Sequence, residues 1–191
     1  MDKITILALD PASHKTGWAI YRNGRITEHG VITLKGVGET SSERTDNRII
    51  DLKNKVCKLI EKHKVAQVVS EDVFRDGDIK HDVASMVLSM CRAAVTIANN
   101  DCGLPKIIRY NPQYVKATVW GYSASKRVCK NMTRQRQKEM MCKAVKELGY
   151  ILNTTKGGTA SDDEADAIGV LIGSVSLSVS EVSSLKPVDL R

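Results

Sequence analysis

No stretch of this sequence stays apolar for 18 residues, which is about the shortest run expected of a helix that crosses a membrane. A signal-peptide pattern is also missing, so we expect a soluble, cytoplasmic protein without a membrane partner. The chain has 191 residues, 42% of them apolar, and no internal repeat or linker divides it. This length suffices for one good core. We therefore expect a single domain over residues 1–175, followed by a serine-rich tail at 176–191.

Metal-binding cysteine and histidine patterns are also lacking. The five cysteines form no CxxC pair, and the four histidines have no spacing typical of zinc ligands. An odd, scattered set of cysteines is typical of reduced thiols in the cytosol. No arrangement of Ser, His and Asp suggests a nucleophilic triad, and nothing points to a small-molecule cofactor. The candidate chemistry is therefore that of carboxylates.

Four carboxylates, far apart in the sequence, lie where strands or helices begin or end. Asp10 and Glu71 each end a short apolar run that predicts a strand. Asp163 and Asp166 are three residues apart in a helical pattern, so they share one face of that helix. Because clustered carboxylates repel one another, a cation has to hold them together. Repeated hard oxygen ligands favour Mg²⁺ or Mn²⁺.

Each of these acids taken alone also has an ordinary structural explanation. Asp10 precedes a proline and suits a turn. The acids at 162–164 would stabilise the start of a helix through its dipole. The dipole favours acids in the first turn generally, however, and does not require Asp166. Together the four favour a site whose catalytic and metal-binding residues are Asp10, Glu71, Asp163 and Asp166.

Basic residues are concentrated in one segment. Residues 106–146 contain eleven Lys or Arg and one acid, Glu139, for a net charge of +10, whereas the whole chain carries +7. Such a concentration is typical of a surface that binds a phosphate backbone. The structural alternative is a solvated helix face next to a basic loop at about 121–133. Nucleic acid is favoured by the aromatic residues among the charges, Tyr110, Tyr114, Trp120 and Tyr122.

The apolar periodicity predicts strands and helices in the order βββαβαβααα, and hence an α/β fold with one mixed sheet. The Asn23-Gly24 pair predicts a tight hairpin between the second and third strands. Pro112 is expected at the first position of a helix. The elements are expected at about 3–9, 17–21, 26–34, 41–63, 66–71, 80–100, 107–110, from 112, 134–148 and from 162.

Four segments together resemble the RuvC Holliday-junction resolvases. LALDPASHKTGWAI resembles the family's first strand, turn and second strand, and VVSEDVF resembles the segment with its second acid. NPQYVKATVWG resembles the Pro-x-x-Val-Lys helix, and DDEADAIGVLIG resembles the C-terminal Asp-x-x-Asp-Ala helix. The resemblance spans about residues 4–172, with the segments in the right order.

The sequence departs from this family at three places. Ala12 stands where the family usually has glycine, and residues 122–133 look like an insertion. Arg134 or Gln135, depending on how that insertion is placed, stands where a lysine is expected. Such departures suit a bacteriophage-type member, which would act in the cytoplasm of its host.

The resemblance implies an RNase H-like fold, a mixed five-stranded sheet flanked by helices with the acids at the edge of the sheet. It also implies a Holliday-junction resolvase. Such an endonuclease nicks four-way and other branched DNA and leaves a 5′-phosphate and a 3′-hydroxyl. Asp10 would bridge two Mg²⁺ ions per active site, with Mn²⁺ able to substitute. Glu71 and Asp166 would complete the ligand shells, and Asp163 would bind or orient the second ion.

The resemblance also assigns residues to the DNA. Phe74 would be a wedge between bases at the junction centre, although a core position explains it equally well. Lys116 would lie near the scissile phosphate, unless it is an ordinary exposed lysine. With the basic segment added, the expected DNA-binding residues are Phe74, Lys116, Lys126, Arg127, Lys130, Arg134 and Arg136.

Two nicks of like polarity call for two active sites related by a two-fold axis, so we expect a homodimer. The helix at 80–100 is apolar on more than one face and suits an interface, and a buried core helix explains it equally well. Two rival functions are a YqgF-type nuclease that acts on RNA and a junction-binding module with weak or no cleavage. The basic segment disfavours the first, and the four acids disfavour the second. An actin-like phosphate-binding fold lacks its second glycine-rich loop here.

Overall fold

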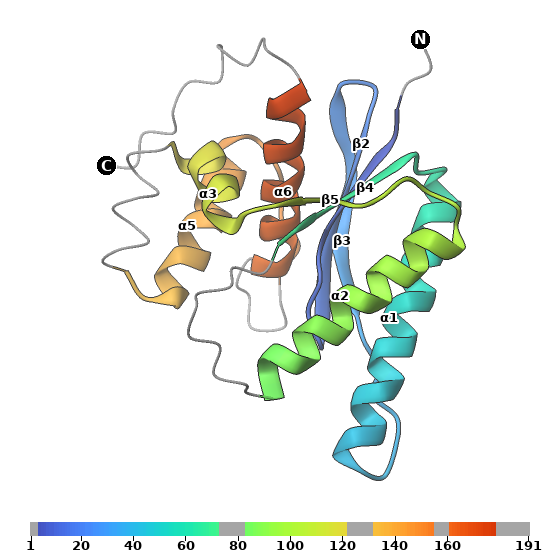
Figure 1. The fold of residues 1–191 in the computed structure, drawn as a ribbon. Helices are drawn as coiled ribbons and strands as arrows, with labels where there is room; N and C mark the ends of the chain where they lie inside the picture. The colour runs from blue at the N-terminus through green and yellow to red at the C-terminus, as the bar shows by residue number, and fades with distance from the viewer. Residues whose placement is uncertain (1–3, 73–82, 122–131, 155–160, 179–191) are drawn as a thin grey trace.

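The computed structural model describes residues 4–72, 83–121, 132–154 and 161–178 (Figure 1). In these ranges the chain forms five strands and five helices in the order that the sequence predicts. The strands are β1 (Ile6–Asp10), β2 (Lys15–Arg22), β3 (Arg25–Thr33), β4 (Gln67–Glu71) and β5 (Ile108–Tyr110). The helices are α1 (Ser41–His63), α2 (Val83–Asp101), α3 (Pro112–Trp120), α5 (Arg134–Glu147) and α6 (Asp162–Ser178).

The strands form one mixed sheet in the order β3-β2-β1-β4-β5. β2 pairs antiparallel with both β1 and β3. β4 pairs parallel with β1, and β5 pairs parallel with β4. Asn23 and Gly24 have φ angles of 56° and 83°, which the hairpin turn between β2 and β3 requires at both central positions. The predicted mixed five-stranded sheet is therefore confirmed, and β1 lies at its centre.

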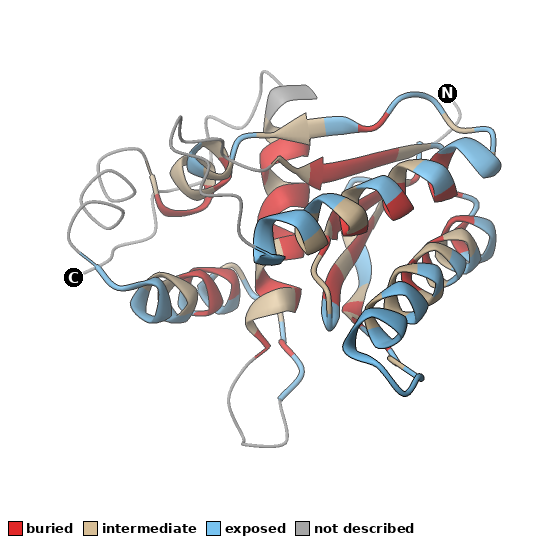
Figure 2. Cartoon of the chain, turned by 60° about the horizontal axis from the view of Figure 1, so that its bottom comes forward, coloured by how far each residue is buried: buried red, intermediate tan, exposed pale blue. Residues whose placement is uncertain are grey.

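Helices cover both faces of the sheet, with α1 and α2 on one side and α3, α5 and α6 on the other (Figure 1). Side chains alternate between the two cores along each strand. Leu7 and Leu9 of β1 pack in the core under α1 and α2, whereas Ala8 packs in the core under α6. Figure 2 shows α6 largely buried and the outer faces of α1 and α2 exposed.

Local signals place several helix ends as expected. Thr40 and Glu43 form a capping box at the start of α1, and Pro112 opens α3 behind its cap Asn111. α6 runs to Ser178, past the expected domain end at residue 175, and most of the expected tail lies outside the described residues. Among the helices of the described ranges, none combines the length and the apolar character needed to cross a membrane.

Candidate active site

Asp10 and Glu71 lie side by side at the ends of the two parallel strands β1 and β4. The register pairs Leu9 with Ser70, so the next positions along the strands are Asp10 and Glu71. Asp10 shares a face with Ala8, and Glu71 shares a face with Val69; both neighbours pack in the core under α6. The two carboxylates therefore point to the α6 side of the sheet.

The other two acids come from the first turns of α6, which crosses this face of the sheet. Gly17 of β2 pairs with Asp10, and a Cβ atom on Gly17 would lie 1.7 Å from the carbonyl oxygen of Asp163. Only glycine permits this close approach. The missing side chain at residue 17 thus allows Asp163 and Asp166 to lie beside Asp10.

All four acids line one cavity of about 310 Å³. Its wall also contains three basic residues, Lys116 from α3 and Arg134 and Lys138 from α5, and the aromatic side chain of Trp120. A smaller cavity of about 190 Å³ extends from Asp10 and Glu71 to Arg92 of α2. Segments far apart in the sequence therefore supply acids and bases to one cleft.

Burial and mutual repulsion raise the pKa values of these acids. Burial raises the pKa of Asp10 well above its ordinary value, and the charges of Asp166, Glu71 and Asp163 raise it further. Burial also raises the pKa of Glu71 to about 6 and that of Asp166 to about 7, the latter with a contribution from Glu71. Negative charge is therefore costly here without a cation.

Lys138 is a residue of this site that the sequence alone did not single out. It forms an ion pair with Asp162, and its charge lowers the pKa values of Asp10, Asp163 and Asp166. The available signal was its spacing, because Lys138 follows Arg134 by four residues and so shares its face of α5. One face of α5 thus presents two cations to the carboxylates.

The other predicted site residues differ in their placement. Lys116 donates a hydrogen bond to Oε1 of Gln137 at 2.9 Å, and its ammonium lies 5.9 Å from the centroid of the Trp120 ring. Arg136 is exposed and pairs with Glu139 at 2.9 Å, and it does not line the cavity. Phe74, Lys126, Arg127 and Lys130 lie outside the described residues.

The donor set at the cavity fits a divalent cation. Four carboxylates supply the hard oxygen ligands that Mg²⁺ and Mn²⁺ prefer. Burial, and then the charges of neighbouring acids, raise the pKa values of Asp10 and Asp166, and a bound cation would stabilise their charged forms. Across the described ranges, however, no three acidic, His or Cys side chains lie close enough together to enclose a metal ion. Binding would therefore need the carboxylates to rotate toward one another.

The mixed five-stranded sheet, with acids at the ends of β1 and β4 and two more on the helix that crosses it, has an RNase H-like fold. The amino-acid sequence assigns the chain to one family with this fold. The family model described as Crossover junction endodeoxyribonuclease RuvC matches residues 6–173, so the chain belongs to the RuvC family. Cleavage by this family depends on metal ions.

Individual relatives agree with this assignment. The crossover junction endodeoxyribonuclease RuvC of Caulobacter sp. (strain K31) is 31% identical over 126 residues, which cover 64% of this chain and 69% of the relative. The protein of that description from Akkermansia muciniphila is 26% identical over 170 residues, 86% of each chain. The structure of T. thermophilus RuvC in complex with Holliday junction substrate has the same fold, with a TM-score of 0.60 at 16% identity, covering 89% of this chain and 92% of that one.

Proposed function

We propose that this chain is a metal-dependent endonuclease that nicks four-way DNA junctions as a homodimer, with two Mg²⁺ ions in each active site. The observation that carries the proposal is the shared cavity of Asp10, Glu71, Asp163 and Asp166, with Lys116, Arg134 and Lys138 on its wall. Acids alone would repel DNA. The cations beside them offset that repulsion and offer contacts for phosphate groups.

Each side chain at the cavity has a defined part in this proposal. Asp10 lies on the central strand, and burial and then the charges of all three other acids raise its pKa. It would therefore be the ligand that the two ions share. Glu71 and Asp166 would complete the two ligand shells, and Asp163 would bind or orient the second ion. Bound there, the ions would activate the attacking water and stabilise the leaving 3′ oxygen, which leaves a 5′-phosphate on the product.

Cations on the cavity wall would position the strand that is cut. Lys116 and Arg134 are within the reach of a phosphodiester held at the carboxylates, since all line one cavity. Lys138 is held by Asp162 and lies beside three of the acids. Fixed positive charges of this kind stabilise the charge that develops on phosphoryl oxygens, and no side-chain nucleophile is needed.

The decisive experiment uses a labelled four-way junction with Mg²⁺, Mn²⁺ or EDTA. We expect paired nicks with either metal, and none in EDTA, mapped on strands of like polarity. Cutting confined to a structured RNA would instead support a nuclease of the YqgF type. Tight junction binding without nicks in either metal would support a binding module.

The four acids provide a variant test. We expect Asp10→Asn, Glu71→Gln, Asp163→Asn and Asp166→Asn each to lower nicking by at least about a thousandfold, since each removes a ligand charge from the metal site. Junction binding in EDTA should stay equal or tighten, because every substitution removes negative charge near DNA. Glu147→Gln, on the exposed part of α5, is the matched control. Wild-type nicking by all four variants would refute the two-ion assignment.

A further inference from the structure

Glu164 is a buried acid between two of the acids at the active site. Its side chain is fully buried, although it lies in the first turn of α6 between Asp163 and Asp166. Successive helical residues are about 100° apart around the axis, so Glu164 points away from the face that Asp163 and Asp166 share. It does not line the cavity of the four acids. Glu164 is therefore not a fifth ligand there.

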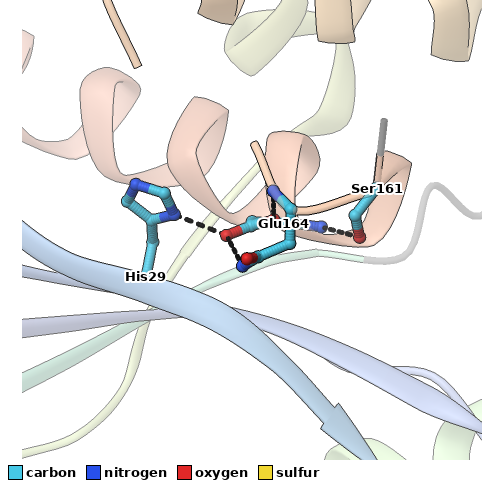
Figure 3. A network of polar contacts seen from close by, with 4 residues as sticks. His29, Ser161 and Glu164 are labelled. Atoms are coloured by element: carbon cyan, nitrogen blue, oxygen red, sulfur yellow. Dashed lines mark hydrogen bonds and ion pairs between the residues drawn. The ribbon is translucent and has the colours of Figure 1, made fainter. Parts of the chain in front are cut away.

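Three nitrogen atoms lie within hydrogen-bonding distance of the Glu164 carboxylate (Figure 3). The backbone N–H of Asn153 donates to Oε2 at 2.8 Å, and its side-chain Nδ2 donates to Oε1 at 2.9 Å. Nδ1 of His29, on β3, lies 2.5 Å from Oε1. The backbone N–H of Glu164 is in turn 3.4 Å from Oγ of Ser161. Three separate parts of the chain thus meet at one side chain.

Stability alone does not explain a carboxylate at this core position. Burying a charged carboxylate is costly even when it is paired, and an apolar side chain of similar volume would often serve stability as well. A fully hydrogen-bonded group instead fixes the orientation of the helix that carries it, because its hydrogen bonds form in only one placement of that helix. The arrangement therefore restricts where α6 sits and how it is rotated.

This restriction acts on the acids of the site. On the sheet side, the Asp163 carbonyl oxygen is pressed against Gly17, the β2 partner of Asp10. On the other side, Glu164 is held by β3 and by the segment that precedes α6. A small rotation of α6 about its axis would swing Asp163 and Asp166 away from Asp10, and the contacts of Glu164 oppose that rotation.

We propose that Glu164 is a positioning residue that, through His29 and Asn153, fixes the rotation of α6 and so sets Asp163 and Asp166 against Asp10 for metal binding. This inference rests on the proposed function, because it takes those three acids to be the metal ligands. Partners that orient ligating groups in this indirect way commonly affect metal affinity about 10–100-fold.

The test compares Glu164→Leu, Glu164→Gln and His29→Gln with the wild type. Leu removes both acceptor oxygens at similar size. Gln keeps one oxygen, which can accept from the backbone N–H of Asn153. Its NH₂ can donate to Nδ1 of His29, in the tautomer that carries the proton on Nε2, and to Oδ1 of Asn153 once that side-chain amide is flipped. Glu147→Gln, which makes the same charge change on the exposed surface of α5, is the control. Mn²⁺ binding is measured by calorimetry without DNA, and hydrogen exchange is followed at the amides of residues 162–168.

We expect Glu164→Leu to weaken Mn²⁺ binding at least about tenfold and to speed exchange in the first turns of α6. Glu164→Gln should stay within about threefold of the wild type, and His29→Gln should fall between the two. Junction binding in EDTA should be unchanged in all of them. This pattern separates positioning from general destabilisation, because a merely structural role would lower the melting temperature while the folded variant bound Mn²⁺ with wild-type affinity.

Wild-type Mn²⁺ affinity in Glu164→Leu would overturn the proposal. If that variant fails to fold, His29→Gln decides the matter, and a folded His29→Gln protein with unchanged Mn²⁺ affinity overturns the proposal in the same way. The proposed function is tested separately by wild-type nicking of the junction. A wild type that binds Mn²⁺ at the four acids but makes no nicks would refute that function, while the comparison of Glu164 variants would still apply.

Discussion

The raised pKa of Asp166 shows that gathering carboxylates at one site lowers the stability of the folded protein. The pKa of Asp166 rises from an ordinary 3.8 to about 7, first because the group is buried and then because Glu71 and Asp162 are near. The folded protein therefore holds a proton on Asp166 over a pH range in which the unfolded chain has released it. Under linkage, stability then falls as the pH rises between the two pKa values.

In EDTA, the melting temperature of the wild type should accordingly fall between about pH 4 and pH 8 as this acid ionises. Asp166→Asn removes the charge, so we expect it to melt roughly 3–8 °C higher than the wild type at pH 8 and at nearly the same temperature at pH 4. Thermal melts across this pH range check the prediction. Added Mg²⁺ should stabilise the wild type and leave the variant nearly unaffected. Identical melting curves at pH 8 would contradict it.

Phe74, the only phenylalanine of the chain, follows Glu71 by three residues and lies outside the described residues. We expect it to be a wedge that distorts the junction strand into the active site. Phe74→Ala should then melt like the wild type and bind the junction with similar affinity, but nick it more slowly. A buried core position would instead cost about 3–5 kcal/mol of stability. A large fall in melting temperature would therefore refute the wedge.

At the scale of the elements, the sequence predicted what depends on local pattern. The acids at the ends of β1 and β4 and the start of α6 at Asp162 were found where apolar periodicity changes. The mixed five-stranded sheet of an RNase H-like fold, with the acids at its edge, came from the resemblance to RuvC. The contacts of Glu164 were not predictable, because they join residues 29, 153 and 164, which no periodicity connects. Lys138 was overlooked because the pairing of α5 with α6 is likewise tertiary.

The basic segment of residues 106–146 spans α3 and α5, which both supply cations to the cavity. We expect it to provide most of the affinity for DNA. Neutralising Lys126, Arg127 and Lys130 together should weaken junction binding and flatten the plot of log affinity against log salt. The slope should fall by about 0.9 for each side chain that contacts a phosphate.

A matched control for this prediction neutralises Lys35, Lys58 and Lys62, which are exposed on α1 and the loop before it. α1 covers the face of the sheet opposite to α6, so these charges lie away from the acids (Figure 1). The control should leave the slope close to that of the wild type. An equal loss of slope in both variants would mean that the net charge of the protein, and not the segment, governs binding.

At the scale of the whole molecule, α2 has two apolar faces. Cys91, Ala94, Val95 and Ala98 are buried against the sheet and α1. On the outer face, Val83 is 72% exposed, Met86 59% and Ile97 51%. These residues, with Met90 and Ala93 between them, recur at spacings of three and four and form one stripe. The two interpretations of this helix are thus compatible, since one face is core and the other is free for a partner.

The stripe is also linked to the active site. Leu88 of α2 lines the cavity of the four acids, and Arg92 of α2 pairs with Asp72, the residue that follows Glu71. A second copy of the chain packed on the outer face of α2 would therefore hold the two active sites at a fixed separation. Fixed separation is what paired cuts in one junction require, because both strands have to reach a site in the same complex.

We therefore expect the wild type to be a homodimer and the double variant Met86→Glu/Ile97→Glu to be a monomer. Two buried acids facing their own copies across a two-fold axis would be strongly repelled and poorly solvated.

Sedimentation of the free protein measures the oligomeric state directly, and a plasmid carrying one cruciform junction separates paired nicks, which linearise it, from single nicks. The variant should stay folded, make single nicks and lose linear product. Lys58→Glu/Lys62→Glu, on the exposed face of α1, should stay dimeric. A wild type that sediments as a monomer, and remains one on junction DNA, would refute the dimer.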